Sequence, residues 1–197
     1  GPSMRTGGGL SESISINTNG AANVQAGLNG SYSANTRAGW GWSVGSSLQV
    51  RTGGRWQVSI SPGYSQTRPV RQYIATLPRG DGGTATYGNR YIFSRIRQSQ
   101  LSTQLRLNYS FTPDLSLEVY AEPFAASGRF SHFGELAAPG SADLRIYGRD
   151  GTSVTRKVDA AGHTSYAVTD GADQFTIARD DFNVVNFNSN VVLRWEW

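Results

Sequence analysis

At 197 residues, with 24 glycines, 38% hydrophobic residues and a net charge of +4, the chain fits one domain with either a sizeable core or a closed barrel. The absence of cysteine excludes disulfides and thiolate metal sites, and no apolar run is long enough for a transmembrane helix. The basic residues are scattered arginines and a single lysine, so we expect no nucleic-acid partner.

The chain begins with Gly1-Pro2-Ser3, which is typical of the remnant of a protease site ahead of a start methionine, Met4. We therefore assign residues 1–4 to an expression scar and start, and residues 5–197 to a single β-barrel domain. No secretion signal follows Met4, so the signal of an exported protein would lie outside this sequence.

Alternation of apolar and polar residues dominates the chain. In ANVQAGLNGSYSA (22–34), alternate positions carry Ala, Val, Leu and Tyr, while most of the others carry Asn, Gln, Gly and Ser. The same pattern recurs in GWGWSVGSSLQV (39–50) and LSTQLRLNYSF (101–111). A period of two is typical of β-strands. These runs reach the roughly 9–11 residues that a transmembrane strand needs.

The alternating runs predict eight long strands, joined in part by short turns such as Asn19-Gly20 and Thr112-Pro113-Asp114. The predicted strands are 10–18, 21–34, 38–51, 55–66, 89–97, 100–111, 114–126 and 183–197. The fifth has the weakest signal, because RYIFSRIRQ does not alternate cleanly.

Two long connections remain, 67–88 and 127–182. The second is rich in Asp and Gly, and we predict that it contains a small hairpin of 154–158 with 164–169. In an eight-stranded outer-membrane barrel the termini share the periplasmic rim, so 127–182 would lie on the outer rim. Connection 67–88 would then lie on the periplasmic rim, where short turns are expected, which indicates a missed strand near 72–78.

All five tryptophans lie on the apolar side of their strands. Counting eight strands predicts Trp56 at one rim and the other four at the opposite rim: Trp40, Trp42, Trp195 and Trp197. Two aromatic girdles on a lipid-facing surface are typical of outer-membrane barrels, and the Gly, Ser, Asn and Gln of the other face could not form a dry core. We therefore expect an all-β, antiparallel up-and-down barrel in the bacterial outer membrane, with a lipid bilayer or detergent as its partner.

The alternative is a soluble β-sandwich or jelly roll that binds or hydrolyses a polysaccharide, because sandwich strands also alternate. Its strands should be shorter and its solvent face more charged than in this sequence. The tryptophans discriminate the two: sugar-binding aromatic residues would gather in one groove, whereas lipid-facing ones would form two belts.

Charged residues on the polar side are predicted to form an interior ladder, because Arg106 lies nearly opposite Glu118 across the 112–114 turn. Its members are Arg106, Glu118, Glu122, Arg194 and Glu196. Glu118 and Glu122 make a poor catalytic pair, since four residues of strand span about 13 Å and glycosidase carboxylates lie roughly 5–9.5 Å apart.

Other candidate chemistry is weak. His132 with Glu135, or His163 with Asp159, could ligate a metal, but neither has a second strong ligand at a recognisable spacing. The aspartates of 127–182 do not follow a calcium-loop pattern, and the RGD tripeptide at 79–81 lies in a Gly-rich turn. No nucleophile elbow or phosphate loop occurs. We assign no catalytic residue, metal ligand or cofactor, and favour a role other than catalysis.

Two segments, 112–139 and 180–197, resemble a bacterial family of uncharacterised C-terminal domains. The matching motifs are Pro113-Asp114-Leu115-Ser116, Tyr120…Pro123-Phe124, Gly128, Asp181-Phe182-Asn183 and Asn190…Arg194-Trp195-Glu196. Domains of that family usually follow a carbohydrate-binding module similar to family 9, and are thought to form outer-membrane-type barrels. The resemblance implies membrane anchoring or transport, linked to glycan handling through a module that this sequence lacks. Family members generally continue past LRWEW, which implies a piece of a larger barrel.

Overall fold

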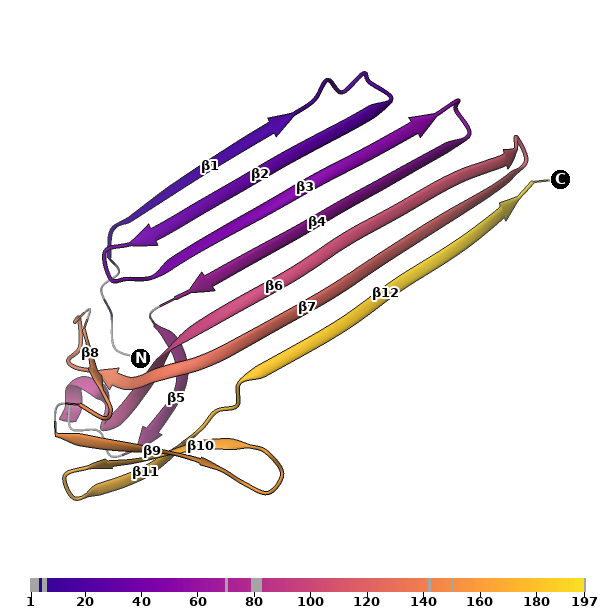
Figure 1. Cartoon of the computed structure of the whole chain (residues 1–197). Coiled ribbons are helices and arrows are strands. Elements are labelled where there is room, and N and C mark those ends of the chain that lie inside the picture. The colour runs from indigo at the N-terminus through magenta and orange to yellow at the C-terminus, as the bar shows by residue number, and fades with distance from the viewer. Residues whose placement is uncertain are drawn as a thin grey trace.

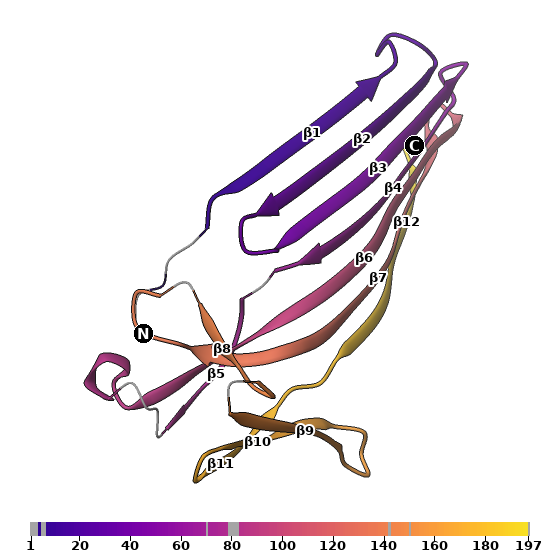
Figure 2. The same cartoon turned by 60° about the vertical axis from the view of Figure 1, so that its left-hand side comes forward.

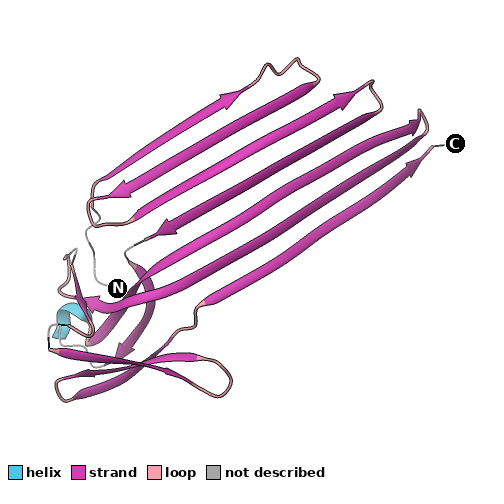
Figure 3. Ribbon diagram, in the orientation of Figure 1, coloured by secondary structure: helices cyan, strands magenta, loops and turns pink. Residues whose placement is uncertain are grey.

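The computed structural model describes residues 4, 7–69, 71–78, 83–141, 143–149 and 151–196. Its regular structure is β throughout, apart from one 3-10 turn, η1 (Gly83–Thr86), and Figure 3 shows this composition. Every strand pairing is antiparallel. The prediction of an all-β, antiparallel fold from the period-two alternation is therefore confirmed.

Seven long strands form the main sheet in the order in which they follow along the chain (Figure 1). They are β1 (Gly9–Asn17), β2 (Val24–Asn35), β3 (Trp40–Thr52), β4 (Trp56–Arg68), β6 (Asn89–Thr112), β7 (Leu115–Leu136) and β12 (Phe182–Trp195). β5 (Gln72–Pro78) pairs with β6, and β8 (Leu144–Ile146) pairs with β7. The sheet is curved (Figure 2) and its edges are β1 and β12. Within the described residues these edges are not paired with each other, so no closed barrel is found.

The predicted strands 89–97 and 100–111 are one continuous strand, β6, of 24 residues. The alternation is lost near 97 because the environment of β6 changes there. Beyond that point the odd positions, such as Leu105, carry the apolar side chains, whereas Ile92 and Ile96 at even positions are buried in a core. The prediction of two strands was wrong because one strand meets two surroundings.

This correction changes which rim each connection occupies. One end of the sheet, which we call the short-turn rim, carries connections 18–23, 53–55 and 113–114 and the end of β12 (Figure 1). Both long connections, 69–88 and 137–181, lie at the opposite end, the long-loop rim. The additional strand expected near 72–78 is β5, which continues the line of β4 alongside β6 after a break at Pro69.

The long-loop rim carries a second, three-stranded sheet (Figures 1 and 2). It consists of β9 (Thr152–Val158), β10 (Thr164–Asp170) and β11 (Asp173–Ala178), and the β9–β10 pairing confirms the predicted hairpin of 154–158 with 164–169. One face of this sheet packs against the ends of β6 and β7. The buried cluster so formed is Ile92, Ile96, Phe130, Phe133, Tyr147, Val168 and Ile177. The main hydrophobic core therefore lies at one end of the molecule.

Gly128 of β7 gives a test of how β12 joins this core. Gly128 pairs with Phe182, and a Cβ atom at position 128 would collide with the Phe182 ring. We expect Gly128→Ala to lower the free energy of unfolding by about 1–3 kcal/mol through overpacking. At Gly63 of β4 a Cβ would meet only ordinary contacts, so Gly63→Ala is the matched control. Urea unfolding followed by tryptophan fluorescence measures both, and equal midpoints would contradict this packing.

Candidate functional site

One face of the main sheet is apolar and uncovered. Because directly paired residues share a face, the registers place Leu28, Leu48, Leu105 and Leu193 on the same side. Leu28 and Leu193 are 53% and 65% exposed, although leucine is usually buried. This surface, which we call the apolar face, crosses all seven long strands. It far exceeds the few hundred Å² that soluble monomers ordinarily expose, which indicates an interaction surface.

Aromatic residues border the apolar face at both rims. At the long-loop rim the Trp42 and Tyr64 rings lie 5.3 Å apart, beside Trp40. Trp56 pairs with Tyr109 at the short-turn rim, and Trp195 ends β12 there. The predicted grouping of Trp195 with Trp40 and Trp42 was wrong, because the main sheet has seven long strands rather than eight. With one strand fewer, β12 runs in the opposite direction to that predicted and ends at the other rim. Trp197 lies outside the described residues.

No charged residue lies on the apolar face between the two aromatic rows, within the described residues. The row of Tyr32, Trp42 and Gln66, in which Glu12 of β1 lies opposite Tyr32, marks one limit, and the row of Trp56 and Tyr109 marks the other. Ten residue steps along β4 separate the rows, which is about 33 Å of strand. A strand tilt of about 35–45° would reduce this to about 25 Å, the height of the apolar band of membrane barrels.

The opposite face, which we call the polar face, carries small polar side chains. The Ser31 and Ser43 hydroxyls are 2.8 Å apart across β2 and β3. On the apolar face, by contrast, the Gln66 amide hydrogen-bonds the Ser99 hydroxyl in the row that borders the face at the long-loop rim. Across β6, β7 and β12 the polar face lines a shallow cavity of about 430 Å³. Its walls include Arg106, Asn108, Glu118, Tyr120, Asn190 and Val192.

The predicted ladder residues Arg106, Glu118, Glu122 and Arg194 lie near one another on the polar face, with a pairing that differs in detail. Arg106 lies opposite Tyr120 and stacks on its ring, with the guanidinium carbon 5.2 Å from the ring centroid. The Tyr120 hydroxyl donates a 2.6 Å hydrogen bond to Glu122. Arg194, rather than Arg106, lies 3.6 Å from the Glu118 carboxylate. The Glu196 backbone N–H donates to Asp114 across the short-turn rim.

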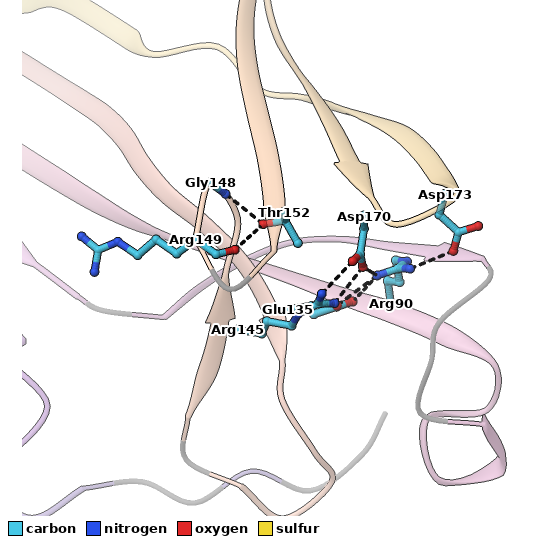
Figure 4. A network of polar contacts seen from close by, with 8 residues as sticks. All are labelled: Arg90, Glu135, Arg145, Gly148, Arg149, Thr152, Asp170 and Asp173. Carbon is cyan, nitrogen blue, oxygen red and sulfur yellow. Dashed lines mark hydrogen bonds and ion pairs between the residues drawn. The ribbon is translucent and has the colours of Figure 1, made fainter.

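A buried charge cluster, unforeseen in the sequence, joins the two sheets at the long-loop rim (Figure 4). Asp170 and Asp173 face each other across the β10–β11 turn, on the same side as Val168. This register aims both carboxylates at Arg90 of β6, with N–O distances of 2.8 and 2.9 Å. Glu135 of β7 lies 3.0 Å from the same guanidinium, which is only 2% exposed.

Arg145 of β8 completes this cluster by bonding Asp170 at 2.6 Å and Glu135 at 3.2 Å. The Arg145 guanidinium and Arg90 together hold the pKa of Asp170 below its usual range. The five residues come from β6, β7, β8 and the β10–β11 hairpin. The cluster therefore fixes the small sheet against the main sheet. No sequence motif signals it, because the residues that bond one another in it are separated by 10 to 83 positions.

Removing Arg90 tests whether the cluster holds the small sheet. Arg90→Met leaves Glu135 and Asp170 buried with only Arg145 beside them, and we expect a loss of about 3–5 kcal/mol. Arg37→Met is the matched control, because the Arg37–Asp143 pair is exposed and should contribute at most about 1 kcal/mol. Hydrogen exchange of the β10 and β11 amides measures both. Equal protection in the two variants would rule out a fastening role for the cluster.

The aspartates of the long connection make structural contacts. Asp180 accepts hydrogen bonds from the Thr164 backbone N–H and from the His163 ring, whose Nδ1 is 2.9 Å away. Asp159 accepts the His163 backbone N–H within its own turn. Asp181 accepts the Phe130 N–H at 2.8 Å. These carboxylates thus fasten turns and strand ends of the long connection.

The His163–Asp180 pair predicts a pH dependence. The hydrogen bond to Asp180, with the charges of Asp180 and Asp159, raises the pKa of His163 above its usual value of about 6.5. A raised pKa stabilises the folded turn fully below about pH 6.5, and this contribution is lost as pH rises through the folded pKa. We expect NMR titration to show the raised pKa, and Asp180→Asn to return it toward about 6.5. In His163→Gln the protection of turn 159–163 should lose this pH dependence; a wild-type-like profile would contradict the assignment.

The two metal candidates lie in different parts of the chain, and neither gains a third ligand among the described residues. His132 lies at a bulge of β7 with a φ of 53°, while His163 lies in the β9–β10 turn. Within the described residues no group of three or more His, Cys, Asp or Glu side chains could hold a metal ion. The RGD tripeptide at 79–81 lies outside the described residues. Over the same residues, no helix is long and apolar enough to cross a membrane.

Comparisons with protein-family models, with curated proteins and with solved structures give no match to this chain.

Proposed function

We propose that the protein is an outer-membrane-type β-barrel domain, or a part of a larger barrel, that serves membrane anchoring or transport. The observation that carries the proposal is the apolar face, a charge-free band of about 33 Å of strand between two aromatic rows. Lipid is the solvent that favours such a surface, because its hydrocarbon core accepts apolar side chains and its interfaces accept tryptophan and tyrosine. The polar face would then line the barrel interior.

The arrangement of the connections supports the same proposal. Outer-membrane barrels have short turns at the periplasmic rim and long loops outside. The sheet has both long connections at one rim, together with the short turn 36–39 and the start of β1, and the shorter connections 18–23, 53–55 and 113–114 at the other. The start of β1 therefore does not share a rim with the end of β12, contrary to the expectation for a complete eight-stranded barrel, and a seven-stranded part of a larger barrel fits this arrangement better. On this proposal the small sheet and its charge cluster would lie on the outer side. The bacterial outer membrane is therefore the proposed location, and a link to glycan handling rests on the family resemblance alone.

The alternative of a soluble β-sandwich finds less support. A sandwich would cover the apolar face with a second sheet. Within the described residues the three-stranded sheet packs instead against Ile92 and Ile96, which lie on the side of the polar face, and only at one end. The four tryptophans within the described residues border two rims and do not gather in one groove, as sugar-stacking residues would.

A charge placed on either face tests the proposal. Leu105 on the apolar face and Gln104 on the polar face are neighbours at mid-strand. Leu105→Arg puts a guanidinium into hydrocarbon near the midplane, at a cost of about 2–4 kcal/mol. Gln104→Arg, the matched control, adds the same charge on the side of Glu122 and should cost little. The measurement is the folded fraction in lipid vesicles across a urea series. Equal tolerance of the two arginines would mean that the apolar face meets water.

A further inference from the structure

A row of arginines lies on the side of the apolar face, just beyond its aromatic border at the long-loop rim. Arg97 of β6 and Arg129 of β7 are directly paired, and both keep the parity of the apolar positions Leu101 and Ala125. Arg68 ends β4 opposite Trp40, one strand over from Arg97. We call these three residues the arginine row.

The arginine row lacks anionic partners among the described residues. None of its three members makes an ion pair or a side-chain hydrogen bond there, and Arg97 and Arg129 are exposed. Asp181, which adjoins β7, is engaged by the Phe130 N–H. Like charges directly opposite on neighbouring strands destabilise a sheet. An external anion bound between Arg97 and Arg129 would therefore relieve their repulsion.

The depth of the arginine row identifies that anion, on the basis of the membrane orientation proposed above. The row lies two residues beyond the row of Trp42 and Gln66, which is about 7 Å along the strand. Aromatic belts lie at headgroup level, so the next row outward meets the phosphates of the headgroups. Guanidinium groups bind phosphate through paired N–H donors.

Among the residues that the structure describes, the short-turn rim has no matching feature. The positions of the apolar face at that rim are Thr52, Trp56, Tyr109, Leu115 and Trp195, and none of them is charged. The two charged residues nearest this border on β3 and β4, Arg51 and Arg55, do not share the parity of the apolar face. The asymmetry indicates a ligand in the leaflet at the long-loop rim only.

We propose that Arg68, Arg97 and Arg129 form a binding site for the phosphate groups of anionic lipid headgroups in the leaflet at the long-loop rim. The site fixes the depth and orientation of the sheet, since phosphate above the row and hydrocarbon below it can be satisfied at one position only.

The test uses the full chain with Arg97→Gln and Arg129→Gln combined. The probes are vesicles of phosphatidylethanolamine alone, vesicles that also contain phosphatidic acid, and vesicles in which oleate supplies equal negative charge. We expect the wild type to prefer phosphatidic acid and the variant to lose that preference by roughly 25-fold, since each of the two arginines near an anionic surface contributes about fivefold. The matched control, Arg51→Gln with Arg55→Gln, removes the same charge at the short-turn rim and should keep the preference.

The urea midpoint of unfolding provides a second readout, because the sign of the difference between variant and wild type should depend on the lipid. In neutral detergent the Arg97→Gln, Arg129→Gln variant should unfold at higher urea than the wild type, because the repulsion is relieved. With phosphatidic acid the order should reverse. An equal preference for oleate, an equal loss in the control variant, or the same stabilisation by millimolar inorganic phosphate would overturn the headgroup site. Insertion of the variant into phosphatidylethanolamine vesicles reports separately on the proposed membrane function, which fails only if insertion itself fails.

Discussion

The pairing of β6 with β7 is the constraint on which the rest of the structure depends. These are the longest strands, with 24 and 22 residues, and they run from the uncovered sheet into the buried core at the long-loop rim. In the halves of β6 and β7 nearer the short-turn rim, the odd positions are mostly apolar and uncovered. In the halves nearer the long-loop rim, even positions such as Ile92, Ile96 and Phe130 are buried beneath the small sheet. The β6–β7 ladder thus joins two regions, the uncovered sheet and the buried core, whose side chains have different surroundings.

The charge cluster lies where these two regions meet. Arg90 is the first arginine of β6, and its carboxylate partners come from β7, β10 and β11, at the end of the β6–β7 pair beside the long-loop rim. A buried ion network is poor evidence of added stability, because desolvation offsets much of the attraction. Its geometric demand is strict, however, since each carboxylate must meet a planar guanidinium at hydrogen-bonding distance. The cluster therefore explains where the small sheet is held more than how strongly.

The sequence predicts those parts of the fold that repeat with period two. Strands such as 38–51 and 55–66 match β3 and β4 closely, because every second residue of these strands meets the same surroundings. The β9–β10 hairpin could also be foreseen from its alternation. β6 could not, because its apolar positions change parity near Arg97, and a parity change resembles a break between strands. The error moved Trp195 to the wrong rim. The charge cluster could not be predicted from the sequence, since only the tertiary structure brings Arg90, Glu135 and Asp170 together.

The position of the small sheet in the chain has a consequence for the order of folding. β6 and β7 are joined by a two-residue turn, so their ladder can form locally, whereas β7 and β12 are separated by residues 137–181. Loop-closure entropy rises with the logarithm of loop length, so the last pairing has the greatest entropic cost among the ladders of the main sheet. The β9–β11 sheet lowers that cost by ordering most of the loop, and Asp181 then holds the start of β12 against Phe130 of β7. The outermost strand at this edge is thus added across the longest separation in the main sheet, and the small sheet orders most of the chain between.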